Sequence, residues 1–341
     1  MSKLRAALPA LLARENLSPA AARAALSELL SGRAEPILAA AFLTALQAKG
    51  AAVAELSALA RLLRAKAAPL SAPKGAVDTC GTGGDMAGTL NISTAASFVV
   101  AAAGVPVAKH GNRAASSRCG AADVLEALGL RLDMPKARVQ QALKQLQIGF
   151  MFAPAWHGAL APLAPLRKML GVPTIFNLVG PLVNPARVRF QLLGVAQAPW
   201  LDLMGASLQQ LGVARAWLVH GAGGLDEVSL SGPTEVLEVT PQRMRRFRLE
   251  PQKLGVRPAP MRALRGGTAA NNARRLTAVL DGKPSAYRDS VRLNAAAALC
   301  VAGRCPDMQA GLQLATEMID SGAAAHKLNA LVTFSQKPRH G

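Results

Sequence analysis

The sequence predicts an α/β fold in two parts, a small all-helical domain and a large α/β domain with a mostly parallel central sheet. Near residue 70, helical apolar spacing without strands gives way to short β-favouring runs that alternate with helices. Such alternation is typical of parallel sheets covered by helices. At 341 residues the chain also exceeds the roughly 250–300 residues at which single cores stop growing, which agrees with two lobes.

Three helices are expected in the first seventy residues. Ser18 and Pro19 supply an N-cap and a first-turn proline, and Gly32 ends that helix. A second helix covers residues 36–50 with its apolar side chains on one face, and a third follows with leucines at helical spacing. Three helices do not easily bury their apolar faces among themselves. We therefore expect this unit to pack on the second domain, which begins after residues 69–74.

The rest of the chain carries the alternation of strands and helices. Strands are expected at 105–108, 217–219 and 236–239, and helices at 94–103, 121–128 and 201–211. In such sheets ligands bind beyond the carboxyl ends of the strands, where loops lead into helix N-termini. The segment 172–185 carries three prolines and two asparagines and is expected to be a connector or hinge.

Composition favours a globular cytoplasmic protein. Hydrophobic residues make up 51% of the chain, and no apolar run reaches the roughly 18–20 residues of a membrane span. The N-terminus lacks the apolar stretch of a secretory signal. The four cysteines form neither a disulfide framework nor a zinc pattern, so reduced thiols are expected.

The formal net charge of +19 favours a polyanionic partner, either nucleic acid, an acidic membrane or a phosphorylated small molecule. Much of the excess lies between Arg243 and Arg275, where ten Lys or Arg residues accompany one acid, Glu250. This stretch has almost no aromatic residues and no recognisable nucleic-acid module. A solvated basic face is therefore the simpler interpretation, and contact with nucleic acid is the alternative.

Three loop motifs combine groups that suit a phosphorylated ligand. Gly81 to Asp85 is a glycine turn that can approach an anion closely, although an ordinary tight turn is equally compatible. It matches neither the P-loop nor the dinucleotide-binding pattern. Asn91 to Thr94 precedes an alanine-rich helix whose N-terminus favours phosphate, with a plain N-cap as the alternative. The loop from residue 109 to 117 gathers cations, amides and hydroxyls, which suit a pyrophosphate plus a sugar phosphate.

Other candidate groups lie further along the chain. Asp226 and Glu227 are adjacent acids beyond a predicted strand, which suits Mg²⁺ bound through oxygen ligands and waters, or else solvated loop acids. Arg167 can hold an organic carboxylate through a planar two-point contact that lysine does not reproduce, or it is a surface arginine. His157 is either a site residue or a packed wall residue.

Taken in this order, the motifs resemble the anthranilate phosphoribosyltransferase family. Further motifs that match are 122–129, Phe176 with Asn177, 180–185 and 225–227. The resemblance covers nearly the whole chain and implies the fold of pyrimidine nucleoside phosphorylases, in which a homodimer forms through the helical domain. It implies that anthranilate attacks C1 of phosphoribosyl pyrophosphate, with Mg²⁺ as cofactor, to give N-(5-phosphoribosyl)anthranilate and pyrophosphate. This is the second step of the tryptophan branch from chorismate.

The resemblance also implies roles for single residues. Phosphoribosyl pyrophosphate, the donor, would be bound by Gly81, Gly84, Asp85, Thr89, Asn91, Ser93, Thr94, Lys109, His110, Gly111, Asn112, Arg113, Ala114, Ala115, Ser116, Ser117 and Ala121. Anthranilate would be bound by Gly81, Asn112, Arg167, Gly180 and Pro181, with Arg167 on its carboxylate. Magnesium would be held by Ser93, Asp226 and Glu227. No side chain is expected to act as a covalent nucleophile or general base, because the aromatic amine is already unprotonated at neutral pH.

Three positions depart from the family pattern. Met86 stands where the family usually has glycine, which should stiffen the loop, and Leu90 replaces a common phenylalanine. Ala121 stands where a serine or threonine usually contacts the donor, so one hydroxyl contact should be absent.

These expectations divide the chain into domains and leave two rival functions. The helical domain is expected to comprise residues 1–70 and about 166–188, and the α/β domain residues 71–165 and 189–341. A nucleic-acid-binding relative of the same fold would suit the high charge. A nucleoside phosphorylase is less compatible with Arg167 and Asn112 in the anthranilate pattern.

Overall fold

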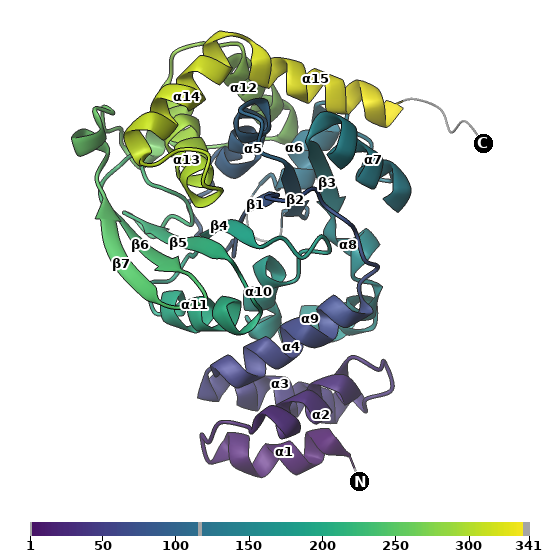
Figure 1. Cartoon of the computed structure of the whole chain (residues 1–341). Helices are drawn as coiled ribbons and strands as arrows, with labels where there is room; N and C mark the ends of the chain where they lie inside the picture. The colour runs from purple at the N-terminus through teal and green to yellow at the C-terminus, as the bar shows by residue number, and fades with distance from the viewer. Residues whose placement is uncertain (1, 115–117, 337–341) are drawn as a thin grey trace.

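The computed structural model describes residues 2–114 and 118–336 of the chain. Three residues that the resemblance assigns to donor binding, Ala115, Ser116 and Ser117, lie outside the described residues. Figure 1 shows two parts, a helical unit at the N-terminal end and a larger α/β domain.

The helical unit holds four helices, one more than expected. They are α1 (Lys3–Leu12), α2 (Pro19–Leu29), α3 (Pro36–Lys49) and α4 (Val53–Lys66). The predicted cap of α2 is confirmed, because the Ser18 hydroxyl accepts a hydrogen bond from the Ala21 N–H at 3.2 Å. The sequence signal for α1 is weak because Pro9 lies inside it, where proline removes a backbone donor.

Seven strands form one sheet in the order β3-β2-β1-β4-β5-β6-β7. Their bounds are β1 (Val77–Gly81), β2 (Val107–Gly111), β3 (Ile148–Phe152), β4 (Phe190–Gly194), β5 (Arg215–Gly221), β6 (Thr234–Val239) and β7 (Met244–Leu249). The ladder from β3 to β5 is parallel, and β6 and β7 extend it antiparallel. The predicted mostly parallel sheet is thus confirmed, and each of the three predicted strands overlaps an observed one.

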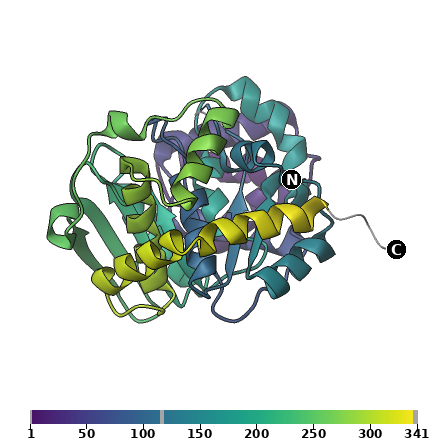
Figure 2. The ribbon, with the colours of Figure 1, turned by 90° about the horizontal axis from the view of Figure 1, so that it is seen from above.

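Helices cover both faces of the sheet. Their bounds are α5 (Ile92–Ala102), α6 (Ala121–Ala127), α7 (Lys136–Leu146), α8 (Ala153–Trp156), α9 (Ala164–Leu170), α10 (Ile175–Val179), α11 (Trp200–Gln210), α12 (Ala269–Leu280), α13 (Ala286–Val301), α14 (Met308–Asp320) and α15 (Ala323–Gln336). Figure 1 places α5 and α12 to α15 over one face and α10 and α11 over the other, and Figure 2 shows α15 running across the top of its layer.

Alternation along the strands divides their side chains between cores on the two faces of the sheet. Leu192 and Trp217 belong to the core under α5 and α13, whereas the next residues, Leu193 and Leu218, belong to the opposite core. That second core also contains the apolar faces of α1 to α4. The expectation that the helical unit packs on the second domain is therefore confirmed.

The predicted connector at 172–185 contains a short buried helix. Ile175, Phe176 and Val179 of α10 are buried in the core that the helical unit shares with the sheet. Apolar side chains among the prolines explain why this segment is packed. The domain boundaries given above stay predictions.

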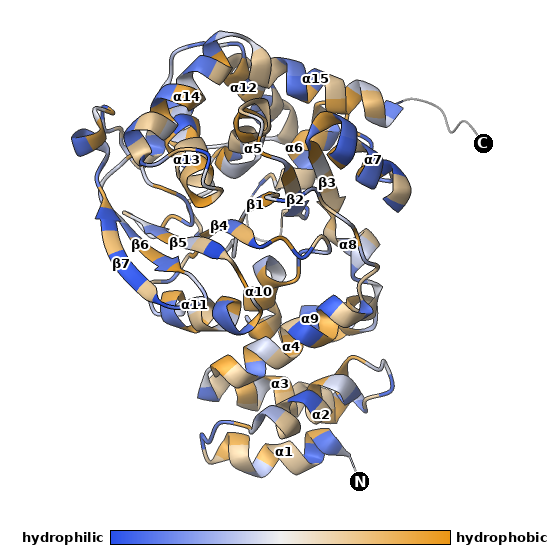
Figure 3. Ribbon diagram, in the orientation of Figure 1, coloured by the Kyte–Doolittle hydropathy of each residue, from blue (hydrophilic) through white to orange (hydrophobic). Residues whose placement is uncertain are grey.

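Two surface properties bear on function. Figure 3 shows hydrophilic residues along much of β7, at the open edge of the sheet. Among residues 2–114 and 118–336, no helix is both long enough and apolar enough to span a bilayer.

Candidate active site

The candidate site lies at the carboxyl edge of the parallel sheet, where β1, β2, β4 and β5 each end in a glycine. Two of these glycines leave room for the loop that carries Asp226. A Cβ atom on Gly194 would overlap the Asp226 backbone, and one on Gly81 would overlap its carboxylate. The loop after β5 therefore lies directly over the ends of β1 and β4, as expected for ligand loops of such sheets.

The two adjacent acids join the first two loop motifs. The Asp226 carboxylate accepts a hydrogen bond from the Gly83 N–H at 2.8 Å, and the Glu227 carboxylate accepts one from the Ser93 N–H at 3.0 Å. Ser93 lies in the first turn of α5, where backbone N–H groups have no partner within the helix. The glycine turn, the helix N-terminus and the acids, which are far apart in sequence, thus meet in one place.

Negative charge is crowded at this place. Desolvation raises the pKa of Asp226 to about 7, with the nearby Asp85 carboxylate adding to the effect. Desolvation and then Asp226 raise the pKa of Glu227 to about 8, although Lys109 opposes this shift. Carboxylates that are costly to ionise together are stabilised by a bound cation.

The residues present fit Mg²⁺, since that ion prefers oxygen ligands and keeps several waters. Across the described chain, no group of three His, Cys, Asp or Glu side chains has the geometry of a metal site. A magnesium ion held by Asp226 and Glu227 would complete its coordination with waters or ligand oxygens.

Lys109, in the middle of β2, lies behind these acids. Its side chain is almost fully buried, and its ammonium donates to the backbone carbonyl of Thr79 and, at 3.4 Å, to the Thr79 hydroxyl. Burial lowers the Lys109 pKa, while Asp78 and Glu227 oppose that shift. The ammonium offsets the negative charge of the buried acids Asp78 and Glu227. Its predicted contact with the donor phosphates would be a second role.

Asn91 is fixed by contacts that the sequence did not reveal. Its amide donates to the Cys119 carbonyl at 3.1 Å and accepts from Asn272 at 3.0 Å, and its carbonyl accepts from the Tyr287 hydroxyl at 3.0 Å. Asn272 and Tyr287 are 181 and 196 residues away in sequence. No local pattern links residues so distant.

The described part of the third loop is closed by Asp123 of α6. This carboxylate accepts from the N–H groups of Ala114 at 2.9 Å and Gly120 at 2.8 Å, on both sides of the loop. Arg113 pairs with Asp123 and Glu126 at 3.0 and 2.7 Å, so its guanidinium is directed toward α6. Exposed ion pairs of this kind contribute little energy, which leaves Arg113 able to exchange partners.

Other predicted donor residues lie around these motifs. The exposed Asn112 accepts from the Arg113 N–H at 2.8 Å through its side-chain oxygen. Thr89 forms an isolated β-bridge with Arg265, which holds the far end of the glycine loop. Ala121 is the first residue of α6 and offers no hydroxyl there.

The predicted acceptor residues come from the segment that packs on the helical unit. Arg167 lies on α9, with its guanidinium 5.3 Å from the centre of the Phe176 ring. Within the described chain this guanidinium has no acidic partner, and burial lowers its pKa. Gly180 and Pro181 begin a 3₁₀ turn, Gly180–Leu182, directly after α10. The structure thus places Arg167 and the acid pair on different elements.

Two buried histidines lie beside this segment. The rings of His110 and His157 meet edge to face at 5.1 Å. His110 Nε2 and both ring nitrogens of His157 have no hydrogen-bond partner within the described residues. Burial lowers the pKa of His110 to about 3 and that of His157 to about 4, so both rings are neutral near pH 7.

A buried polar network that sequence reasoning missed supports the site from below. The Asn184 amide donates to the Asp78 carboxylate at 2.7 Å and to the Ala108 carbonyl at 2.8 Å. Asp78 also accepts from the His110 N–H at 3.2 Å. Part of the signal was present, because Asn184 lies within the 180–185 motif that matched the family.

Comparison with known proteins places the whole chain in one group. Residues 5–67 match the helical bundle domain of the glycosyl transferase family, and residues 73–325 match its a/b domain. The chain is 49% identical over 322 residues to the anthranilate phosphoribosyltransferase of Rhodospirillum rubrum, covering 94% of this chain and 93% of the relative. It is 47% identical to that of Azospirillum brasilense over 335 residues, covering 98% and 94%.

Solved structures agree with these relatives. The anthranilate phosphoribosyltransferase of Thermus thermophilus superposes with a TM-score of 0.92 at 40% identity, covering 99% of this chain and 100% of that chain. The Saccharomyces cerevisiae protein, in complex with PRPP and Mg, gives a TM-score of 0.90 at 27% identity and 97% coverage of both chains.

Proposed function

Since the chain belongs to the anthranilate phosphoribosyltransferase family, we propose that it transfers the 5-phosphoribosyl group of phosphoribosyl pyrophosphate to the amine of anthranilate. The products are N-(5-phosphoribosyl)anthranilate and pyrophosphate. This reaction is the second step of the tryptophan branch from chorismate. The observation that carries this proposal is the junction in which Asp226 and Glu227 bind the glycine turn and the start of α5.

The donor would lie over the carboxyl edge of the sheet. The turn from Gly81 to Asp85 and the first turn of α5 would offer N–H groups to its phosphates. Lys109 and Arg113 would add positive charge, Arg113 by leaving its exposed partners on α6. These groups neutralise the charge that develops on pyrophosphate as its bond to C1 breaks.

Magnesium is supported by the acid pair and by the ion present in the yeast relative. Asp226, Glu227 and the Ser93 hydroxyl would hold it. When bound, the ion would neutralise the leaving pyrophosphate and orient it.

Anthranilate would lie near the segment that carries Arg167. Its carboxylate would pair with this guanidinium, which has no acidic partner of its own within the described chain. Gly180 and Pro181 would line its path. The neutral rings of His110 and His157 leave the positive charge of Arg167 as the attraction for the carboxylate.

Positioning would supply much of the acceleration. The aromatic amine is unprotonated at neutral pH, so no residue has to act as a strong base. Aligning the amine, C1 and the leaving oxygen converts an encounter of two molecules into a step within one complex. We therefore assign no side chain as a covalent nucleophile. Isolation of a ribosyl-enzyme adduct would contradict this assignment.

The test follows the fluorescence of anthranilate in the presence of phosphoribosyl pyrophosphate and Mg²⁺. We expect fluorescence to fall with time as the amine is ribosylated, and to stay constant when either the donor or Mg²⁺ is omitted. Constant fluorescence with all components, in a sample folded by circular dichroism, would refute the proposed function.

The nucleic-acid-binding alternative is not favoured, because the relatives matched over more than nine tenths of the chain carry the name of the enzyme. A salt series with single-stranded DNA would revive that alternative if binding were tight and steeply dependent on salt. A homodimer formed through the helical unit and a cytoplasmic location are further parts of the proposal.

A further inference from the structure

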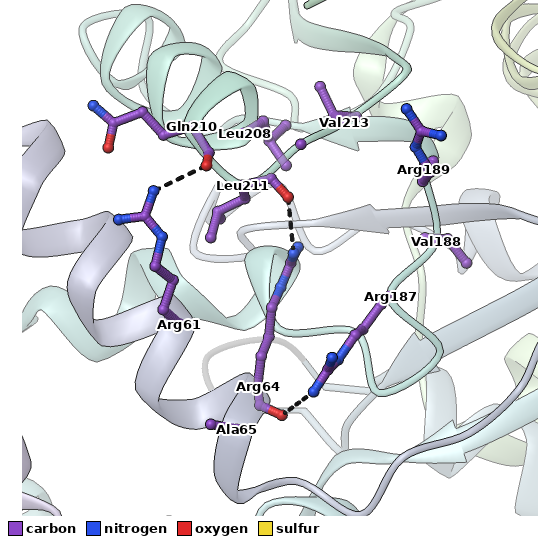
Figure 4. Close-up of a pocket in the computed structure, with 11 residues that line it drawn as sticks. Arg61, Arg64, Ala65, Arg187, Val188, Arg189, Leu208, Gln210, Leu211 and Val213 are labelled. Atoms are coloured by element: carbon purple, nitrogen blue, oxygen red, sulfur yellow. Dashed lines mark hydrogen bonds between the residues drawn. The ribbon is translucent and has the colours of Figure 1, made fainter.

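A basic cavity lies between the helical unit and the α/β domain, remote from the candidate active site. Its volume is about 460 Å³, and its walls carry four arginines. Arg61 and Arg64 come from α4, and Arg187 and Arg189 from the segment before β4 (Figure 4). This is the amino end of the strands, whereas the active-site loops follow their carboxyl ends. At about 3.3 Å per residue, strands of five residues separate the two places by roughly 15 Å or more.

Among the described residues that line the cavity, none is an acid. The other residues that line the cavity are apolar or uncharged, among them Leu208, Gln210 and Val213. Burial, and then the positive charges of Arg187 and Arg61, lower the pKa of Arg64 to about 10. Like charges gathered in a half-buried hollow repel one another unless an anion lies among them.

Backbone carbonyls satisfy only part of this cluster. Arg61 donates to the carbonyl of the last residue of α11 at 2.9 Å, and Arg187 donates to the Arg64 carbonyl at 3.1 Å. Arg64 donates to the carbonyls of Leu182 and Leu211 at 2.7 and 3.4 Å. Figure 4 shows Arg61 and Arg64 reaching toward the end of α11. Because a guanidinium carries five N–H groups, most donors of the cluster remain open.

Arg189 is the arginine of this cavity whose side chain stabilises no described part of the fold through a polar contact. Its side chain makes no hydrogen bond or ion pair within the described residues. An exposed arginine without a partner is ordinary by itself, but this one lines the same hollow as three others. Guanidinium forks match pairs of phosphate oxygens, and a cavity of about 460 Å³ is many times the roughly 30 Å³ that one water molecule occupies.

We propose that this cavity is a second anion site, which binds a small molecule with several phosphate charges, such as pyrophosphate. The ligand would be held by Arg61 and Arg64 from one side and by Arg187 and Arg189 from the other. A ligand gripped in this way bridges the helical unit and the α/β domain. Its binding therefore stabilises the folded protein. Binding in this cavity would not require the proposed reaction.

The experiment measures binding of inorganic pyrophosphate by calorimetry and by thermal unfolding, with EDTA present and ionic strength held constant with sodium chloride. We expect the unfolding temperature of the wild type to rise by several degrees. Arg61→Gln with Arg189→Gln should weaken binding at least tenfold. The control Arg243→Gln with Arg257→Gln removes the same charge at exposed positions and should leave binding unchanged.

Two further variants make the result decisive. Arg61→Lys with Arg189→Lys keeps the charge but removes the planar forks, and should bind with intermediate affinity. Asp226→Asn with Glu227→Gln alters the active-site acids and should leave this binding in place. Equal binding by the wild type and the Arg61/Arg189 glutamine variant would overturn the inference. Loss of binding in the Asp226/Glu227 variant, or an equal rise in unfolding temperature with chloride alone, would overturn it too.

Discussion

Arg167 is the residue on which acceptor recognition depends in the proposed function. Its guanidinium stacks near Phe176 and lacks an acidic partner among the described residues, so it is free to pair with a carboxylate. We expect Arg167→Ala to raise the KM for anthranilate by about 10- to 100-fold, the equivalent of about 1.5–3 kcal/mol for a charged hydrogen bond, with little change in the KM for the donor.

Steady-state kinetics with each substrate varied in turn checks this split. Lys168→Ala, at the exposed neighbouring position, is the matched control and should behave as the wild type. An unchanged KM for anthranilate in Arg167→Ala would remove Arg167 from the acceptor site.

The acid pair predicts a dependence of stability on pH. The raised pKa values of Asp226 and Glu227, about 7 and about 8, mean that the metal-free folded state holds more protons than the unfolded chain above pH 4. Its free energy of unfolding should therefore fall as the pH rises from about 4 to about 8, as far as these groups contribute. Mg²⁺ needs both groups ionised, so its stabilising effect should grow over the same range.

Thermal unfolding of the wild type and of Asp226→Asn with Glu227→Gln, with EDTA or with Mg²⁺, measures this effect. The variant should lose both the Mg²⁺ shift and this part of the pH dependence. Glu15→Gln with Glu317→Gln, at exposed acids, is the charge-matched control. If Mg²⁺ stabilised the variant as much as the wild type, the ion would bind elsewhere.

The backbone of Met86 is strained. This agrees with the family pattern, in which glycine is usual at this position. Its φ is +54°, in the left-handed region that favours glycine, and its side chain is 91% exposed. Replacing Met86 by glycine would relieve about 1–2 kcal/mol of backbone strain in the folded protein. The greater conformational freedom of glycine in the unfolded chain would offset about 0.4–1 kcal/mol of this gain. We expect Met86→Gly to raise the free energy of unfolding by up to about 1 kcal/mol.

Denaturant unfolding compares Met86→Gly with Met86→Ala, which removes the same side chain but keeps the strain. The alanine variant should stay within about 0.5 kcal/mol of the wild type, as for an exposed site. A glycine variant less stable than the alanine variant would show that this position carries no strain.

At the scale of elements, Glu55 holds the helical unit together. Its buried carboxylate accepts from the N–H groups of Leu17 at 3.0 Å and Ala52 at 2.7 Å, and pairs with Lys49 at 3.0 Å. It thus caps α4, fixes the chain before α2 and neutralises a lysine whose side chain is only 3% exposed. Glu55→Gln should destabilise the protein by about 3–5 kcal/mol, because the buried Lys49 ammonium loses its acidic partner and keeps a hydrogen bond to the neutral Asn16 side chain at 2.8 Å.

Chemical denaturation measures this loss. Adding Lys49→Met to Glu55→Gln should recover part of the stability, since the uncompensated charge is then gone. A loss below about 1 kcal/mol in the single variant would mean that the pair contributes no more than a surface ion pair.

Two arginines of β7 form ion pairs with acids of the neighbouring strand β6, which a count of charged residues along the sequence does not reveal. Arg245 lies opposite Glu238 and Arg248 opposite Glu235, and the two ion pairs measure 3.1 and 3.4 Å. These two acids come from β6, outside the stretch from Arg243 to Arg275 that holds ten basic residues and one acid. Cross-strand pairing thus neutralises part of a face that the sequence predicted as simply solvated and basic.

At the scale of the whole molecule, the proposed homodimer needs an apolar surface on the helical unit. Leu12, just inside the end of α1, and Ile37, at the start of α3, are 73% and 78% exposed. Exposed apolar side chains mark interaction sites where they gather in one patch, so the proposal assigns both residues to the dimer interface. We expect the wild type to have the mass of a dimer in light scattering, and Leu12→Glu with Ile37→Glu to have that of a monomer.

Met244→Glu is the control for this prediction, because Met244 is an exposed apolar residue of β7 in the α/β domain and belongs to none of the helices α1 to α4. It should leave the dimer intact. A wild type that is monomeric at micromolar concentration would contradict the dimer outright.

Much of the architecture was predictable, because local patterns encode it. The cap at Ser18 and the alternation of strands and helices act over a few residues, and both were read correctly. The chemistry of the loops was visible in the same way. Their partners were not, because Asn272 and Tyr287 reach Asn91 only through the fold. The arginine cavity is likewise invisible in sequence, since its residues come from separate segments.

The junction between Asp226, Glu227 and the first loops also has a consequence for synthesis on the ribosome. During synthesis, Ser93 and Gly83 leave the ribosome 134 and 143 residues before the acids that bind them. Strand β1 likewise cannot pair with β4 until the chain has been made as far as β4. The nascent N-terminal half therefore cannot assemble the phosphate loops, and domains that rely on such distant contacts fold slowly. A truncated chain released before residue 226 would consequently have no competent site, so incomplete products of translation are inactive by construction.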